Sequence, residues 1–320
     1  MSAARFGCLA LAAVSCCAVA QSYPTKPIRI VVGQPPGGST DLVARPLAKI
    51  MSEGLGQPIV IDNRPGAGSL VGVDIVAKAA PDGYTLLMVA ASFTINPALH
   101  RQLPFDPLKD FAPLSLLSSF PNLLVVHPSV AARSVQELIA LAKADPGRLN
   151  YGSSGIATGT HLSMELFKYM AGGLDIVHVP FKGGPPGVNA LVAGQVQVNM
   201  STISTAMPHV KSGALRALAV SSARRAPALP DIPTVAEAGV PGYDYSSWVG
   251  LLAPATPPRG VIERLVSESA KAVQAAEVRK VLALEGAEPV GSGPEEFASV
   301  IRREIAAWKK VVDSAGIKAD

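Results

Sequence analysis

The sequence is poor in cysteine, and its cysteines are confined to the start of the chain. All three, Cys8, Cys16 and Cys17, fall within the first 20 of the 320 residues. Removal of that segment would leave a chain without any thiol. Disulfide bonds and thiolate metal sites are therefore excluded from the remainder.

Aromatic and charged residues are also scarce, at 5% and 16% of the chain. The net charge is +4, but the basic residues are scattered and only pairs such as Arg302-Arg303 are adjacent. The absence of a basic stripe interleaved with aromatics argues against nucleic-acid binding. With 48% hydrophobic residues the chain can bury a large core, and its length indicates about two domains.

The first 20 residues have the pattern of a secretory signal peptide. Arg5 provides a positive start, residues 6–19 an apolar core, and Ala18-Val19-Ala20 a small-residue cleavage site. This run is too short to span a membrane, and no later run reaches the length of about 18 residues that a spanning helix needs. We predict export and cleavage. A lipoprotein modified at Cys16 or Cys17 is the alternative.

A stretch rich in glycine and proline, residues 33–41, separates a predicted strand at 28–32 from a predicted helix at 42–51. Its glycines allow a tight turn, and its last three residues are all competent helix N-caps. A helix N-terminus exposes N–H groups and a partial positive charge, which suits a small anion such as a carboxylate. An ordinary strand-to-helix turn is the alternative interpretation. The candidate ligand-binding residues are Gly37, Gly38, Ser39, Thr40 and Asp41.

A second loop, residues 150–161, repeats this arrangement before a helix predicted at 162–170. Small residues admit a ligand, while hydroxyls and helix N–H groups supply donors. The two loops lie about 115 residues apart in the sequence, so they would have to face each other across a cleft. The candidate residues of this loop are Ser153, Ser154, Gly155, Thr158, Gly159, Thr160 and His161.

The order of predicted elements, strands alternating with helices, indicates an α/β protein with a mostly parallel sheet. Ser92 follows a buried strand at 84–90 and lies at the edge where open α/β sheets collect ligands. Residues 97–113 are predicted to form irregular surface, and a strand is predicted at 122–127. A capping box at Ser134 predicts a helix over 135–144, and a second capping box at Thr234 predicts a short helix. Trp308 is predicted to lie in the core.

The sequence offers little catalytic chemistry. The five histidines show no metal-ligand spacing, and no paired-carboxylate, Walker A or Gly-x-Ser-x-Gly motif is present. We therefore predict no metal, no cofactor and no enzyme activity. Ser154 with His161 is the one imaginable nucleophile and base, but helix capping or ligand hydrogen bonding explains His161 more simply.

Seven motifs together resemble the receptors of the tripartite tricarboxylate transporter family, the periplasmic Bug proteins. They run in order through essentially the whole mature chain. They are Tyr23-Pro24-x-Lys26-Pro27-Ile28-Arg29, Pro36-Gly37-Gly38-Ser39-Thr40-Asp41, Asn63-Arg64-Pro65-Gly66-Ala67-Gly68, Pro81-Asp82-Gly83-Tyr84-Thr85-Leu86, Tyr151-Gly152-Ser153-Ser154-Gly155, Val179-Pro180-Phe181-Lys182-Gly183 and Leu229-Pro230-Asp231-Ile232-Pro233-Thr234-x-Ala236-Glu237-Ala238-Gly239.

The resemblance implies a two-lobed periplasmic binding protein fold of the type II kind, each lobe a mixed sheet flanked by helices. Lobe I would comprise residues 21–122 and 252–320, and lobe II residues 123–251. In such receptors the two loops hold a carboxylate from opposite lobes, partly through water. The resemblance adds Ser92, Phe181 and Ser201 to the pocket.

Three positions depart from common members of the family. Many relatives have Phe at the position of Gln34 and Tyr at that of Phe181, and some have Asp at that of Ser201. Because an Asp suits an amino group, a serine at this position disfavours an amino-acid ligand.

The resemblance implies a monomeric periplasmic receptor that delivers a small organic acid to the membrane permease subunits of its transporter. A sensor subunit that signals to a membrane kinase is one alternative, and an exported hydrolase using Ser154 is another. Neighbouring permease genes would favour transport, and turnover of acyl substrates would favour the hydrolase. The sequence leaves the identity of the acid open.

Overall fold

The structure, a computed structural model, describes residues 23–34, 36–37, 39–284 and 286–315, with no side-chain detail for Ser39, Ser314 and Ala315. The predicted signal peptide, with Cys16 and Cys17, and the predicted binding residue Gly38 lie outside the described residues. Within the described part, no helix combines the length and apolar character that crossing a membrane requires.

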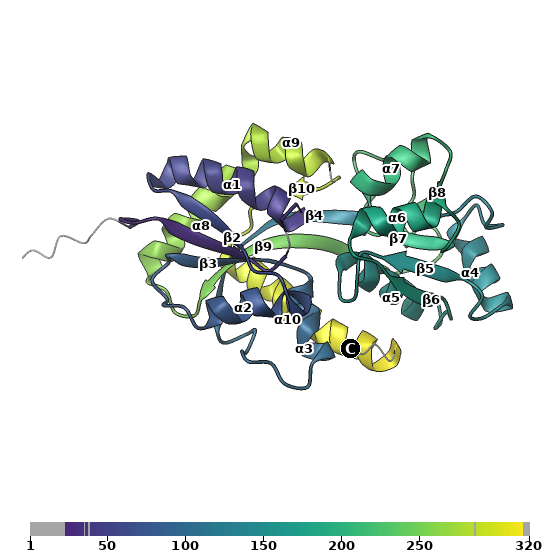
Figure 1. The fold of residues 1–320 in the computed structure, drawn as a ribbon, viewed down its shortest axis with the longest axis horizontal. Coiled ribbons are helices and arrows are strands. Elements are labelled where there is room, and N and C mark those ends of the chain that lie inside the picture. The colour runs from purple at the N-terminus through teal and green to yellow at the C-terminus, as the bar shows by residue number, and fades with distance from the viewer. Residues whose placement is uncertain (1–22, 35, 38, 285, 316–320) are drawn as a thin grey trace, which may run out of the picture.

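Lobe I is built on a sheet formed by both ends of the chain (Figure 1). Its elements, in chain order, are β1 (Ile28–Val32), α1 (Ser39–Leu55), β2 (Ile59–Asn63), the 3-10 turn η1 (Ala67–Ser69), α2 (Leu70–Ala77), β3 (Thr85–Ala90), α3 (Ser92–Leu99), α8 (Arg259–Gln274), α9 (Ala276–Leu284), β10 (Glu288–Pro289) and α10 (Pro294–Ala315). β1 pairs in parallel with β2 and β3, so the carboxyl ends of these strands meet at one edge, next to the amino ends of α1 and α3.

Lobe II is built on a second, smaller sheet from the middle of the chain. Its elements are α4 (Val135–Ala144), β5 (Asn150–Ser153), α5 (Gly159–Met170), β6 (Val177–Pro180), α6 (Gly184–Val192), β7 (Val198–Thr202), α7 (Ile203–Lys211) and β8 (Arg216–Val220). β5 pairs in parallel with both β6 and β7. The carboxyl ends of β5 and β7 therefore lie together, each followed by a helix.

Two long strands, β4 (Phe111–Val126) and β9 (Ser246–Pro254), connect the lobes (Figure 1). Residues 111–121 of β4 pair antiparallel with β9, which in turn pairs with β3. From Asn122 onward, β4 pairs with β7 and β8 instead. The same strand thus belongs to both sheets, and the architecture is the predicted mixed, two-lobed α/β fold.

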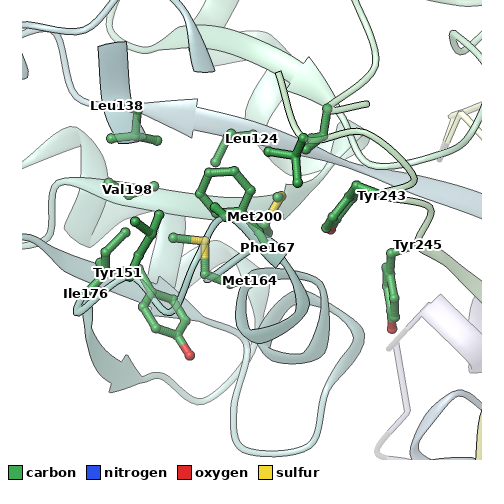
Figure 2. Close-up of a cluster of buried hydrophobic side chains, with 14 of the residues drawn as sticks. Leu124, Leu138, Tyr151, Met164, Phe167, Ile176, Val198, Met200, Tyr243 and Tyr245 are labelled. Carbon is green, nitrogen blue, oxygen red and sulfur yellow. The ribbon is translucent and has the colours of Figure 1, made fainter. Parts of the chain in front are cut away.

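Each lobe has apolar clusters on both faces of its sheet. In lobe II the larger cluster includes Leu124, Tyr151, Phe167 and Tyr243, all nearly inaccessible (Figure 2). Burial of one such side chain contributes about 1.5–3 kcal/mol, so these clusters hold the strands and helices of each lobe firmly together.

The last helix, α10, packs against both lobes. Phe297 and Ile301 belong to a lobe I cluster, whereas Trp308, Val311 and Val312 belong to the large lobe II cluster. Figure 1 shows α10 running beneath the β4–β9 connection toward α5. The prediction that Trp308 is a core residue is confirmed, since only 4% of it is exposed.

The capping box predicted at Ser134 is present, but the one at Thr234 does not start a helix. Glu137 N–H donates to Ser134 Oγ at 3.2 Å, and α4 spans the predicted range. Thr234 makes the same contact with Glu237 N–H at 3.0 Å, yet the residues that follow form a turn. One helix-type bond forms, from Ala238 N–H to Thr234 O at 2.9 Å, and Gly239, at φ 122°, ends the turn directly after it.

Two predictions around β4 are wrong. Residues 97–113 are not all irregular, because Pro97 lies inside α3 and β4 already begins at Phe111. Burial of Phe93 and Ile95 holds α3 in place despite its proline. The strand predicted at 122–127 is the last third of β4, and a register shift after Pro113 accommodates the proline in the sheet.

Several helices also differ from the sequence expectation. α1 continues through Pro46 to Leu55, past the predicted end at residue 51, and α5 begins at Gly159 and not at residue 162. α7 was not predicted. Glycine, proline and serine at these positions weaken the helical pattern, and tertiary packing overrides the local preference.

A substitution at Gly250 of β9 tests how closely α10 packs against strands β4 and β9. A Cβ at this position would lie 2.1 Å from Cζ of the buried Phe297. We expect Gly250→Ala to lower the free energy of unfolding by about 1–3 kcal/mol, measured by urea denaturation, because the core is overpacked. Gly260→Ala in α8, where a Cβ meets open space, is the matched control and should not destabilise. Equal stability of the two variants would contradict the close packing.

Candidate functional site

The lobe I pocket lies where β1 and β3 end. Gly37, at φ 80°, makes the turn into α1, a conformation that favours glycine. Thr40 Oγ1 donates to Gln34 Oε1 at 2.7 Å, which ties the first turn of α1 to the strand end. The pocket is lined by Gly33, Gln34, Thr40, Ser69, Val73, Leu87, Met88, Val89, Ala90, Ser92 and Phe93.

Asp41, two per cent exposed, holds the loop of the lobe I pocket in shape. Its Oδ2 accepts from Gly37 N–H and from Arg45 Nε, both at 2.9 Å. Its Oδ1 accepts from Arg45 Nη2 at 3.0 Å and from Asn63 Nδ2 at 3.0 Å. Burial by itself would raise the pKa of this carboxyl, but the hydrogen bonds from Arg45, Gly37 and Asn63 lower it below its ordinary value. Asp41 therefore acts on the site through the loop that it supports.

The lobe II pocket lies where β5 and β7 end, and it is lined largely by hydroxyl groups. Its residues are Ser153, Ser154, Thr160, Gly184, Gly187, Asn199, Met200, Ser201, Thr202 and Thr205. Four of the predicted binding residues, Ser153, Ser154, Thr160 and Ser201, are thereby brought together.

The hydroxyls at the amino end of α5 bond to one another. Ser154 N–H donates to Thr160 Oγ1 at 2.9 Å, and the two side-chain oxygens lie 2.8 Å apart. Thr158 Oγ1 donates to Gly155 O at 2.7 Å. Because a hydroxyl can rotate and exchange one partner for another, this network can turn donors toward an incoming anion.

Sequence reasoning missed the residues that α7 contributes. Thr202 and Thr205, which end β7 and open α7, line the lobe II pocket beside Ser201, and their hydroxyl oxygens lie 2.9 Å apart. A signal was present, because Ser201-Thr202-Ile203-Ser204-Thr205 places hydroxyls between a strand and a helix, as in the two predicted loops. Gln34 and Ser69, which line the lobe I pocket, were also not predicted as binding residues.

Among the described residues, no ionisable side chain lines either pocket. Each combines neutral donors with the amino end of at least one helix, α1 and α3 in lobe I and α5, α6 and α7 in lobe II. This donor set suits an anion and offers no carboxylate to an ammonium group. No group of three or more potential metal ligands occurs among the described residues.

The two pockets are separate in this structure, because each is lined by residues of one lobe alone. The sequence expectation placed both loops around one ligand. The structure puts one loop in each of the two lobes that the β4–β9 connection joins.

His161 and Phe181, two predicted binding residues, line neither pocket. His161 is three per cent exposed, accepts from Ala157 N–H at its Nδ1 and stacks 4.2 Å from the ring of His178. Burial and, to a smaller extent, the charge of Lys168 lower its pKa to about 4, so it is neutral at pH 7. Phe181 is half-buried, with its ring close to Gly187 at the edge of the lobe II pocket.

Ser154 and His161 do not form a nucleophile–base contact. Ser154 Oγ bonds to Thr158 and Thr160, whereas Nδ1 of His161 accepts from a backbone N–H. A buried serine, Ser153, lies 2.7 Å from Nε2 of His178, but only two per cent of Ser153 is exposed. Neither pair presents an activated serine to the cleft.

Comparison with known proteins identifies the family. Residues 43–317 match the family model described as the tripartite tricarboxylate transporter family receptor, TctC. The chain belongs to this family. A curated relative, BugT of Bordetella pertussis, is 36% identical over 312 residues, which cover 97% of this chain and 95% of BugT. The family consists of solute-binding receptors.

Solved structures of similar proteins have the same fold. "R. palustris Rpa4515 with adipate" has a TM-score of 0.81 at 38% identity and covers 92% of this chain and 99% of that chain. "MatC (Rpa3494) from Rhodopseudomonas palustris with bound malate" has a TM-score of 0.78 at 33% identity, with 91% of this chain and all of that chain covered. The predicted family and two-lobed fold are thus confirmed.

The support that Asp41 gives to the lobe I loop depends on pH in a defined direction. Its pKa is lowered in the folded state, so the stability it contributes is present above the ordinary value of 3.8 and is lost as the pH falls through the folded value. We expect Asp41→Asn to cost about 1–3 kcal/mol of unfolding free energy at pH 7 and progressively less below about pH 4. Denaturant melts across this range measure the difference.

Asp145→Asn is the control, because Asp145 is 58% exposed in its ion pair with Arg148 and such pairs contribute little. An Asp41→Asn variant as stable as the wild type at pH 7 would show that the carboxylate is dispensable for the loop.

Proposed function

We propose that this protein is a periplasmic receptor that binds a small carboxylate between its two lobes and passes it to the permease subunits of its transporter. The observation that carries the proposal is the pair of pockets, one in each lobe, both formed by helix amino ends and neutral donors, with no ionisable side chain among the described residues that line them. The adipate and malate named for two related structures support a small organic acid. Export through the predicted signal peptide and a monomeric state complete the proposal.

Binding would stabilise an arrangement in which both pockets reach the same ligand. Two helix-dipole contacts contribute roughly 0.3–2 kcal/mol each, whereas a micromolar complex needs about 8 kcal/mol. The remainder must come from hydroxyl donors and from burial of the ligand body between the lobes, both of which are available only when the lobes close. The proposed ligand-binding residues are the predicted residues that line the two pockets, joined by Gln34, Ser69, Thr202 and Thr205. The predicted ones are Thr40, Ser92, Ser153, Ser154, Thr160 and Ser201.

The proposed lobe boundaries, residues 21–122 with 252–320 and residues 123–251, place each pocket within one lobe. Closure would then be a movement of one lobe on the other about the β4–β9 connection, and the two pockets would become one site.

A thermal-shift and calorimetry screen tests this function. The protein is unfolded and refolded to remove carried-over ligand, then mixed with mono-, di- and tricarboxylates, amino acids and matching amides. We expect an acid at 100 times its Kd to add about 2.7 kcal/mol of stability, and its diamide or an equivalent amine to add none. Thr160→Val removes one hydroxyl of the lobe II pocket and the acceptor of Ser154 N–H, so it should lower the melting temperature of the free protein somewhat and weaken binding of the same acid at temperatures where the variant is still folded.

The proposal does not survive a screen in which only uncharged compounds stabilise the protein. Likewise, a Thr160→Val variant with unchanged affinity would remove this hydroxyl from the proposed binding set.

A further inference from the structure

Two adjacent residues of β9, Ser247 and Trp248, connect to the helices that open the two pockets, Ser247 directly to α5 and Trp248 through Glu304 of α10 to α3. Because successive side chains of a strand point to opposite faces, these two reach different neighbours. Both lie where β9 pairs with residues 119–120 of β4, next to the point at which β4 passes from one sheet to the other.

Ser247 lies against Gly159, the first residue of α5. A Cβ on Gly159 would be 2.1 Å from Ser247 Oγ and 3.2 Å from Tyr245 OH, so any larger residue would force the Ser247 side chain or α5 to move. The carbonyl of Gly159 also accepts from Asn122 Nδ2 of β4 at 3.0 Å. The amino end of α5, which carries Thr158 and Thr160, is therefore held on both crossing strands.

Trp248 reaches the other pocket through Glu304. Its Nε1–H lies 2.9 Å and 3.0 Å from the two carboxylate oxygens of Glu304, and Oε2 accepts from Thr94 Oγ1 at 2.7 Å. Thr94 belongs to the first turn of α3, which begins at Ser92 of the lobe I pocket.

Glu304 occupies a core-facing position of α10. Phe297, Ile301 and Trp308 lie seven, three and four residues away on the same buried stripe, at helical spacing. Burial raises the pKa of the Glu304 carboxyl, and the hydrogen bonds from Thr94 and Trp248 oppose that effect. Burying a polar side chain on an apolar stripe costs folding free energy unless the side chain forms hydrogen bonds. Thr94 and Trp248 provide those bonds for Glu304.

We propose that Ser247 and Trp248 are positioning residues for ligand binding, because together they set where the two pockets stand relative to each other. Ser247 sets how closely α5 approaches the crossing strands, and Trp248, through Glu304, sets the first turn of α3. The inference rests on the proposed function, since it concerns the two halves of that binding site.

A rescue experiment tests the Ser247 contact. Gly159→Ala should weaken adipate binding, measured by calorimetry, by at least about fivefold, equivalent to about 1 kcal/mol at 1.4 kcal/mol per tenfold. Removal of the colliding oxygen in Gly159→Ala/Ser247→Ala should restore most of the affinity that Gly159→Ala loses, while Ser247→Ala alone, which removes the contact that sets the approach of α5, should weaken binding by less than Gly159→Ala does. Gly260→Ala, a helical glycine whose Cβ meets open space, is the matched control and should bind as the wild type does.

A second readout needs no ligand. The chain has no cysteine after Cys17, so spin labels at Glu53→Cys of α1 and Ala140→Cys of α4, both exposed, report the distance between the lobes. We expect Gly159→Ala to shift or broaden this distance distribution, and the double variant to return it to the wild-type form. If no acid binds the wild type, the proposed function fails, whereas the distance measurement still decides on the positioning role.

The Trp248 contact is tested at Glu304. Glu304→Gln keeps an acceptor for the indole and should retain affinity at pH 7, whereas Glu304→Leu removes it and should weaken adipate binding and broaden the distance distribution. The inference is overturned if Gly159→Ala leaves both readouts unchanged, if the double variant fails to restore them, or if Glu304→Leu matches Glu304→Gln in both.

Discussion

The antiparallel pairing of β4 with β9 is the interaction on which the rest of the structure depends. Residues 111–121 of β4 run beside β9 in lobe I, and residues 122–126 of the same strand run beside β7 and β8 in lobe II. Every other strand reaches the opposite lobe only through these two. Because a slip of one residue reverses every side chain of a strand, the register that places Ser247 and Trp248 on opposite faces also fixes which pocket each one supports.

In the proposed function, the pockets bind a ligand through geometry more than through charge. A lysine or arginine beside the ligand would attract an acid strongly, but its charge would lose water on binding, which costs free energy. The same charge would also slow the release of the bound acid. Neutral hydroxyls and helix amino ends contribute less each, and they do so fully only when both lobes face the same anion. A receptor that must release its cargo is well served by an affinity that depends on closure, since opening removes half of the contacts at once.

The sequence predicts the parts of this protein whose chemistry is local. The two loops could be identified because a strand, small residues, hydroxyls and a helix follow one another within about ten residues, and Ser154 and Thr160 indeed share a pocket. The length of β4 could not be predicted, because Ser115, Ser118 and Asn122 interrupt its apolar pattern and are buried only by the crossing. The inward placement of Glu304 was missed for the same reason, since its donors lie 56 and 210 residues away in the sequence.

The charged side chains near the two pockets contact the backbone and helices behind the pockets and do not line the pockets themselves. Asp41 lies behind the lobe I loop and Glu304 behind α3, so two carboxylates stand close to a pocket that suits an anion. Each carboxylate is satisfied by its own hydrogen-bond donors. Asp41 accepts from Arg45, Asn63 and a backbone N–H, and Glu304 accepts from an indole and a hydroxyl. Charged hydrogen bonds are stronger and more directional than neutral ones, and therefore they suit the task of fixing backbone that must not move. The surfaces that meet the ligand, which must bind and release it, are left to groups that can exchange partners.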